Sequence, residues 1–458
     1  MIATTRTGLP RRTIAGYAVG SLGTGGFATL PGLVLVFYLT DTLGVAALFA
    51  GALVTLAKIW DVLIDPLIGA LSDRWLRRTG SRRALMLLGA CTIPLFFVLT
   101  FAVPRNVPPV WAGVWVLVAF LLTATSFSLF QVPYIALPAE IADSYDERTR
   151  LLTWRVVVLT LAILLFGAGG PALRHLVSDE YVGYVVVAVV AGVLIGIGML
   201  VAVFTAVPRH ETRVEEREAP PSLRTGYAEG LAALRRSAPF RALLSTFLLQ
   251  GLATGLMLAS ANYVAVWVLH SDDALTFLFV ALIAPALVCA PLWGLIARRI
   301  GKERGYAIAS ALFGLAALSL TGMLFSAGPW VYLPVALAGA GYAGMQSLPM
   351  AMLPDVIAHD ALSQGPGRAG TFGGMWTAGE TTGMALGATA LAVVLAVSGY
   401  TESVGSAAVT QSPAAVVGIV LSFSLVPTVI IAISLVTLRR YRLRRSDIEA
   451  LETQEVIA

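Results

Sequence analysis

Two aspartates lie one helical turn apart inside an apolar segment of the chain. Asp61 and Asp65 occur between Lys58 and Pro66. A spacing of four places both carboxylates on one face of a helix, where they can share a cation or a proton. Arg74, the first arginine of the following loop, is about 13 Å further along the helix, so the pair is too deep to reach the interface. Carboxylates at membrane depth mark ion or substrate pathways, and we therefore expect cation coupling here.

The elements that must position this pair are membrane-spanning helices. The chain has 458 residues, of which 57% are hydrophobic and 12% charged, and its mean hydropathy is +0.83. Its apolar runs are long enough to cross a hydrocarbon core of about 30 Å. The sequence predicts an all-α polytopic membrane protein with twelve spans, at 13–40, 45–72, 84–103, 109–139, 152–173, 181–207, 239–270, 274–297, 305–326, 329–357, 370–398 and 413–438.

Arginines gather in alternate loops, whereas the other loops hold few cations and the acids Asp41, Asp179, Asp272 and Glu402. By the positive-inside rule, we expect both termini to be cytoplasmic, and we expect the chain to lie in the cytoplasmic (inner) membrane. The net charge of +5 is thus a topology signal and does not indicate a nucleic-acid partner. Cys91 and Cys289 fall within spans and form no disulfide framework.

The two halves of the chain resemble each other. Pro133–Ala142 aligns with Pro349–Ala358, and Gly69–Arg74 has a counterpart in Gly294–Arg299. Two parallel six-helix repeats with the substrate site between them are typical of major facilitator transporters. We expect an N-terminal bundle over 1–207, a cytoplasmic loop over 208–238, a C-terminal bundle over 239–440 and a cytoplasmic tail over 441–458.

Several motifs resemble the glycoside–pentoside–hexuronide:cation symporters, the major facilitator family of the melibiose permease. They cover nearly the whole chain and comprise Phe37–Gly44, Trp60 to Pro66, Gly69 to Arg77, Pro133 to Pro138, and Gly370 to Gly387. The resemblance implies that Asp61 and Asp65 bind the coupling cation and that Arg155 lies near the substrate. It also places Ser128 where a family hydroxyl helps to hold sodium.

The departures from the family pattern concern the cargo and the ion. Two family acids that contact the sugar are replaced by Gly25 and Gln131, and a sodium-binding amide by Ile64. The family's helix-eleven Lys is Thr381, with Glu380 just before it. The coupling carboxylates are retained while the sugar-recognising acids are lost, and the changes favour a proton over a sodium ion.

The candidate site residues form three groups, and interhelical packing is the alternative for most of the polar and aromatic ones. We expect cation coupling by Asp61, Asp65, Ser128 and Glu380. We expect Asp73 and Arg74 to act in gating. Substrate binding is expected from Arg155, Gln131, Gly25, Tyr263, Trp267, Gln346, Trp376 and Thr381.

The function expected from this sequence is secondary active symport of a cation and a small organic solute, a glycoside being one candidate, by alternating access. A lysolipid or amphiphile transporter of the same fold, and a non-transporting scaffold or sensor, are the alternatives. The sequence contains no enzyme motif and its four histidines form no metal-spaced cluster, so we expect no cofactor or metal besides the coupling ion, H+ or Na+. The expected partners are the solute, the cation and membrane lipid, with the chain a monomer.

Overall fold

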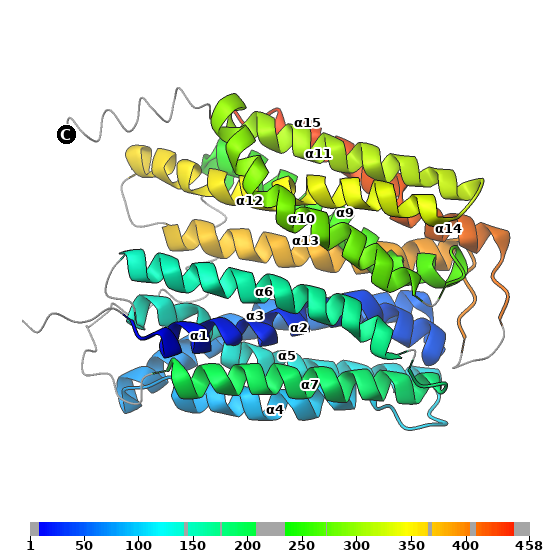
Figure 1. Ribbon diagram of the computed structural model, residues 1–458, viewed down its shortest axis with the longest axis horizontal. Coiled ribbons are helices and arrows are strands. Elements are labelled where there is room, and N and C mark those ends of the chain that lie inside the picture. The colour runs from blue at the N-terminus through cyan, green and yellow to red at the C-terminus, as the bar shows by residue number, and fades with distance from the viewer. Residues whose placement is uncertain are drawn as a thin grey trace, which may run out of the picture. The chain divides into compact units, whose positions relative to one another are not determined.

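The computed structural model describes residues 9–141, 145–174, 176–207, 234–271, 273–364, 369–403 and 409–443. Within these ranges the chain forms helices and no strand (Figure 1), which confirms the predicted all-α class. The chain divides into two compact units, which we call unit 1 (Met1–Pro220 with Glu402–Ala408) and unit 2 (Pro221–Thr401 with Val409–Ala458). Most of the predicted loop 208–238 and tail 441–458 lies outside the described residues.

Unit 1 runs from blue to green in Figure 1. Its first span is broken at Gly20 into α1 (Arg11–Val19) and α2 (Ser21–Phe37). It closes in a π-helical turn, η1 (Tyr38–Thr42). The remaining helices are α3 (Ala47–Thr79), α4 (Arg83–Phe101), α5 (Pro109–Ile141), α6 (Tyr145–Arg174) and α7 (Glu180–Thr205).

Asp41 is not the loop residue that the charge pattern suggests. The turn η1 extends the first span as far as Thr42, and Asp41 is only 3% exposed. The Thr40 hydroxyl donates to the Asp41 carboxylate at 2.6 Å, which supplies a polar partner to a buried acid. The alternating-charge argument thus misplaced this residue, because a π turn carries the helix further than hydropathy indicates.

Short-range chemistry sets several helix ends in unit 1. Helix α3 ends at Gly80, whose φ of 70° is the left-handed conformation that favours glycine at a helix C-terminus. Helix α7 begins after Asp179, whose carboxylate accepts from the Val182 backbone N–H. This bond, and secondly the one from Arg105, hold the pKa of the exposed Asp179 carboxyl below its usual value.

Unit 2 runs from green to red in Figure 1. Short 3₁₀ turns, η2 (Leu320–Leu324) and η3 (Pro329–Val331), lie between two of its long helices. The last predicted span is divided at Ser424 into two helices. The helices are α9 (Ala238–Trp267), α10 (Ala274–Ile300), α11 (Lys302–Ser319), α12 (Tyr332–Gln364), α13 (Ala369–Val397), α14 (Pro413–Phe423) and α15 (Leu425–Leu438).

Eleven helical segments of the described chain are long and apolar enough to cross a membrane. The remaining predicted span, 329–357, corresponds to α12, a helix of 33 residues. Its glycines and polar residues such as Gln346 lower its apolar character without shortening it. With α12 as the twelfth, the segments account for the twelve predicted spans.

Glycine contacts bring α9 and α13 close together in unit 2. A Cβ added at Gly387 would lie 2.3 Å from the backbone nitrogen of Leu256 and 2.8 Å from the Cα of Gly255. Backbone atoms cannot move aside as a flexible side chain can, so the two helices pack at this distance only because a side chain is absent.

We expect Gly387→Ala to destabilise unit 2, since overpacking of this kind costs about 1–3 kcal/mol. The thermal unfolding midpoint in detergent should fall by several degrees. Gly294→Ala is the matched control, because a Cβ at that helical glycine would meet nothing within 4 Å. Equal midpoints for the two variants would contradict this account of the α9–α13 contact.

Candidate functional site

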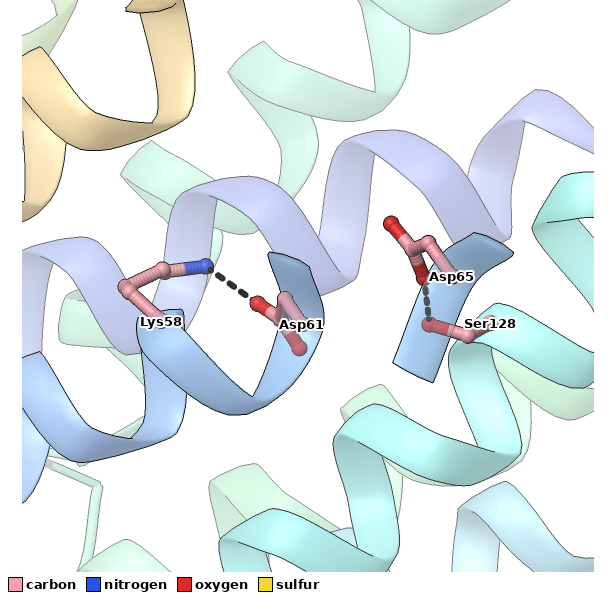
Figure 2. A network of polar contacts seen from close by, with 4 residues as sticks. All are labelled: Lys58, Asp61, Asp65 and Ser128. Carbon is pink, nitrogen blue, oxygen red and sulfur yellow. Dashed lines mark hydrogen bonds and ion pairs between the residues drawn. The ribbon is translucent and has the colours of Figure 1, made fainter. Parts of the chain in front are cut away.

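The two predicted coupling carboxylates lie on one uninterrupted helix, α3, and have different partners (Figure 2). The Lys58 Nζ forms an ion pair with Asp61 Oδ2 at 3.1 Å, three residues apart on the same helix. The side chain of Asp61 is 16% exposed and that of Lys58 32%. Asp61 is therefore already neutralised by a cation belonging to its own helix.

Asp65 is held by a different helix. The Ser128 hydroxyl of α5 donates to Asp65 Oδ1 at 2.5 Å (Figure 2). One turn away, the Trp60 indole N–H donates to the Thr125 hydroxyl at 3.0 Å, so two bonds fix the register of α3 against α5. Asp65 and Ser128, both expected at the cation site, are thus in direct contact, and their role in coupling stays a prediction.

Lys58 was not among the expected site residues, yet it is the ion-pair partner of Asp61. It lies three residues before Asp61, the spacing at which helical side chains meet, so the pattern that identified the aspartates also contained their counter-ion. Within this stretch of α3, the ionised forms of Lys58, Asp61 and Asp65 carry a net charge of −1. Arg155, expected near the substrate, lies against Tyr134.

Arg155 lies in a tyrosine cluster of unit 1. Its guanidinium carbon lies over the phenol ring of Tyr134, 5.5 Å from the ring centre. That phenol donates to the Tyr17 carbonyl and bonds the Ser21 hydroxyl. The Nε of Arg155 is buried without a hydrogen-bond partner among the described residues, so the guanidinium retains donor capacity.

Gly25 and Gln131, the residues expected in place of two family acids, both make contacts with neighbouring helices. A Cβ at Gly25 would lie 2.7 Å from the Cβ of Ala162 on α6, so this glycine serves helix packing. Gln131 accepts a hydrogen bond from the Thr24 hydroxyl through Oε1 at 2.8 Å. The amide nitrogen takes no part in that bond, and substrate binding at Gln131 stays a prediction.

The candidates of unit 2 fall into separate groups. Glu380 on α13 is half-buried and lies within electrostatic range of Tyr342, whose phenol hydrogen-bonds Gln346. Trp376 is 2% exposed and stacks on Phe247 with ring centres 4.2 Å apart, and its indole nitrogen is buried without a partner in the described chain. Thr381, next to Glu380, is half-buried.

Two further aromatic candidates pack around a single tyrosine. The Trp267 indole N–H donates to the Tyr400 hydroxyl at 2.9 Å. Tyr263 is fully buried and meets the Tyr400 ring edge-on with centres 5.5 Å apart. These contacts give Tyr263 and Trp267 a packing role in unit 2.

The proposed gating pair is only partly visible. Arg74 is exposed near the end of α3. The side chain of Asp73 lies outside the described residues, so the expected ion pair between them stays a prediction.

The sequence of this chain is similar to those of known membrane transporters. The MFS/sugar transport protein family matches residues 16–445. This chain belongs to that family. It is 25% identical to the glucuronide carrier protein homolog of Escherichia coli, with 91% of this chain and 89% of the relative covered. It is 24% identical to the sodium-dependent lysophosphatidylcholine symporter 1 of Gallus gallus, with 74% and 70% covered.

A solved structure shows the same fold at lower identity. A structure described under substrate recognition in proton-dependent oligopeptide transporters matches with a TM-score of 0.66 and 15% identity, covering 96% of this chain and 99% of that one. The chain is thus an integral membrane transporter of the major facilitator fold and not an enzyme, as the repeat and the helix-two motif predicted.

Proposed function

We propose that this transporter is a symporter that moves one proton together with one small organic solute. The proposal rests on the different partners of the two carboxylates on α3. Asp61 forms an ion pair with Lys58, whereas Asp65 accepts only a neutral hydroxyl among its described contacts. Because Lys58, Asp61 and Asp65 together carry a net charge of −1, binding of one monovalent cation makes these three side chains neutral overall. A neutral group crosses between environments at a lower desolvation cost than a charged one.

The ligand chemistry favours a proton over a sodium ion. A metal cation of this kind binds through several oxygen ligands. Here Lys58 engages Asp61, and Ile64 stands where the family has an amide, so Asp65 and Ser128 are the oxygen donors that remain on this face. A proton needs one carboxylate oxygen only. Glu380, in unit 2, is a second carboxylate that we propose for proton handling.

The cargo that Arg155 suits best is a solute with a carboxylate, for example a glycoside of a uronic acid. A planar guanidinium with a free N–H binds a carboxylate through directed, charge-assisted bonds. The similarity to a protein named as a glucuronide carrier homolog supports this class.

Uptake into proteoliposomes tests the proposal. Methyl glucuronide, methyl glucoside and fluorescent lysophosphatidylcholine are offered under a pH gradient alone and under a sodium gradient alone. We expect accumulation of the glucuronide under the pH gradient. Saturable stimulation by sodium at fixed pH, with no uptake under a pure pH gradient, would show the proton assignment wrong.

Arg155→Gln should lower glucuronide uptake at least tenfold and leave any uptake of the neutral glucoside within about twofold, since charge-assisted bonds contribute about 1.5–3 kcal/mol. Arg155→Lys should retain the charge but not the planar donors, and fall between the two. Equal losses for charged and neutral sugars would instead indicate that Arg155 only supports the fold around Tyr134.

An amphiphile is the second candidate cargo. Gly25 is filled by α6 packing and cannot present a sugar-binding acid. A relative with 24% identity is named as a lysophosphatidylcholine symporter. In the same assay, transfer of lysophosphatidylcholine without glucuronide uptake would select this function.

We also propose the topology that the charge pattern predicts. Both termini lie in the cytoplasm, the protein acts as a monomer in the inner membrane, and no cofactor besides the coupling ion is required. The arginine-rich alternate loops support this orientation. Reporter fusions after residue 443 and between α6 and α7 should give opposite signals.

A further inference from the structure

The connection between α13 and α14 contributes to the unit that does not contain those helices. Glu402–Ala408 belongs to unit 1, whereas α13 and α14 belong to unit 2. We refer to the two described residues of this segment, Glu402 and Ser403, as the strap. The strap follows α13 closely in the chain, with Ser398–Thr401 between them.

Ser403 attaches the strap to the end of the first span. Its backbone N–H donates to the Thr40 carbonyl at 3.1 Å, and its hydroxyl donates to the Asp41 carbonyl at 2.7 Å. Ser403 is 7% exposed. Both acceptors belong to the π turn η1, whose irregular bonding leaves carbonyl oxygens available to another segment.

Glu402 attaches the strap to the start of α3. Its Oε1 accepts from the Ala47 backbone N–H at 2.9 Å, and Ala47 is the first residue of that helix. The preceding residue, Ala46, provides no side-chain cap, and the first turn of α3 holds no acid. Glu402 therefore acts as the missing N-cap, and its negative charge complements the positive end of the helix.

We propose that the strap is a latch of the transport cycle: Glu402 and Ser403 dock on η1 and α3 in one access state and detach in the other. Movement of unit 2 relative to unit 1 pulls on a segment that is covalently continuous with α13. Three hydrogen bonds resist that pull: two hold the end of the first span, and the third holds the start of α3, the helix that carries Lys58, Asp61 and Asp65. Glu402 is thus a positioning residue for the coupling helix.

This inference rests on alternating movement of the two units but not on the identity of the ion or the cargo. It can therefore be tested on protein without solute. Spin labels are placed at Leu176→Cys in unit 1 and Phe325→Cys in unit 2, which are 77% and 91% exposed, with Cys91→Ser and Cys289→Ser in the background. Pulsed electron paramagnetic resonance then gives the distribution of distances between the labels in the full chain.

We expect two populations in the parent. Glu402→Ala and Ser403→Ala should each change the ratio of the two populations about fivefold and in the same direction, the change that corresponds to the loss of one helix cap or one buried hydrogen bond. Glu402→Gln retains an oxygen acceptor and should restore most of the parent ratio. A single population in the parent, or an unchanged ratio in both alanine variants, would overturn the proposal.

Gln411→Ala is the matched control. Gln411 lies in the same connection, and its side chain bonds the backbone of Thr401 twice, at 3.0 Å and 2.7 Å. Both of those residues belong to unit 2. The variant should leave the ratio within twofold of the parent; a change as large as that of Glu402→Ala would mean that any loosening of the connection has the same effect, and the latch would be rejected.

Discussion

Asp65→Asn should abolish accumulation of solute under a gradient while leaving exchange of solute across the membrane. An amide has nearly the size of a carboxylic acid and can still accept from the Ser128 hydroxyl. It cannot gain or lose a proton, so the group on α3 no longer changes charge during the cycle. The internal solute concentration should reach the external one and rise no further, and counterflow from preloaded proteoliposomes should continue.

The control for this variant is Thr125→Ala. It removes the bond from Trp60 that ties α3 to α5 but changes no charge, so accumulation should persist at a reduced rate. Full accumulation by Asp65→Asn would show that Asp65 is not the coupling group. Loss of accumulation in Thr125→Ala as well would show that the α3–α5 register, rather than the charge, is what the first variant disturbs.

The second large effect is expected from breaking the ion pair between Lys58 and Asp61. Lys58→Met leaves the two carboxylates with a net charge of −2. Asp61→Asn leaves Lys58 and Asp65, whose net charge is zero without a bound cation. Each should lower proton-driven uptake more than tenfold. Removing one partner of a buried pair costs about 3–5 kcal/mol, but Lys58 is 32% exposed, so solvent screening reduces the effect well below that range.

The double variant Lys58→Met/Asp61→Asn restores a net charge of −1, which Asp65 alone then carries. We expect it to recover at least tenfold over either single variant, a coupling that double-mutant analysis measures directly. Additive losses would mean that the two residues act independently and that Lys58 is not the counter-ion. The measurement is initial uptake under a pH gradient with expression matched by immunoblot.

The sequence predicted the spans and the carboxylate pair because both depend on strong local signals. A hydrophobic run of twenty residues and a deep aspartate need no knowledge of their neighbours. The pairing of Asp65 with Ser128 was reached through the resemblance, since nothing local joins residues 63 positions apart. Lys58 had a local signal, the helical spacing to Asp61, but a lysine within reach of a helix end is as readily solvated as paired.

Other features could not be obtained from the sequence. The burial of Asp41 follows from a π turn, which differs from an ordinary helix end by small changes in backbone angles that no residue type specifies. The capping of α3 by Glu402 joins residues 355 positions apart, and a lone acid in a polar connection is normally solvated. Tyr263 and Trp267 were plausible ligands by type alone, and only Tyr400 reveals how they pack.

The close contact at Gly25 limits which residues this position of α2 can hold. Any residue larger than glycine would bring its Cβ to 2.7 Å from Ala162 and 3.1 Å from the Leu159 carbonyl. An acidic side chain therefore cannot be introduced at Gly25 by a single substitution, because α6 would first have to withdraw from α2. A change of cargo specificity in this transporter must start from other positions, where a side chain has room.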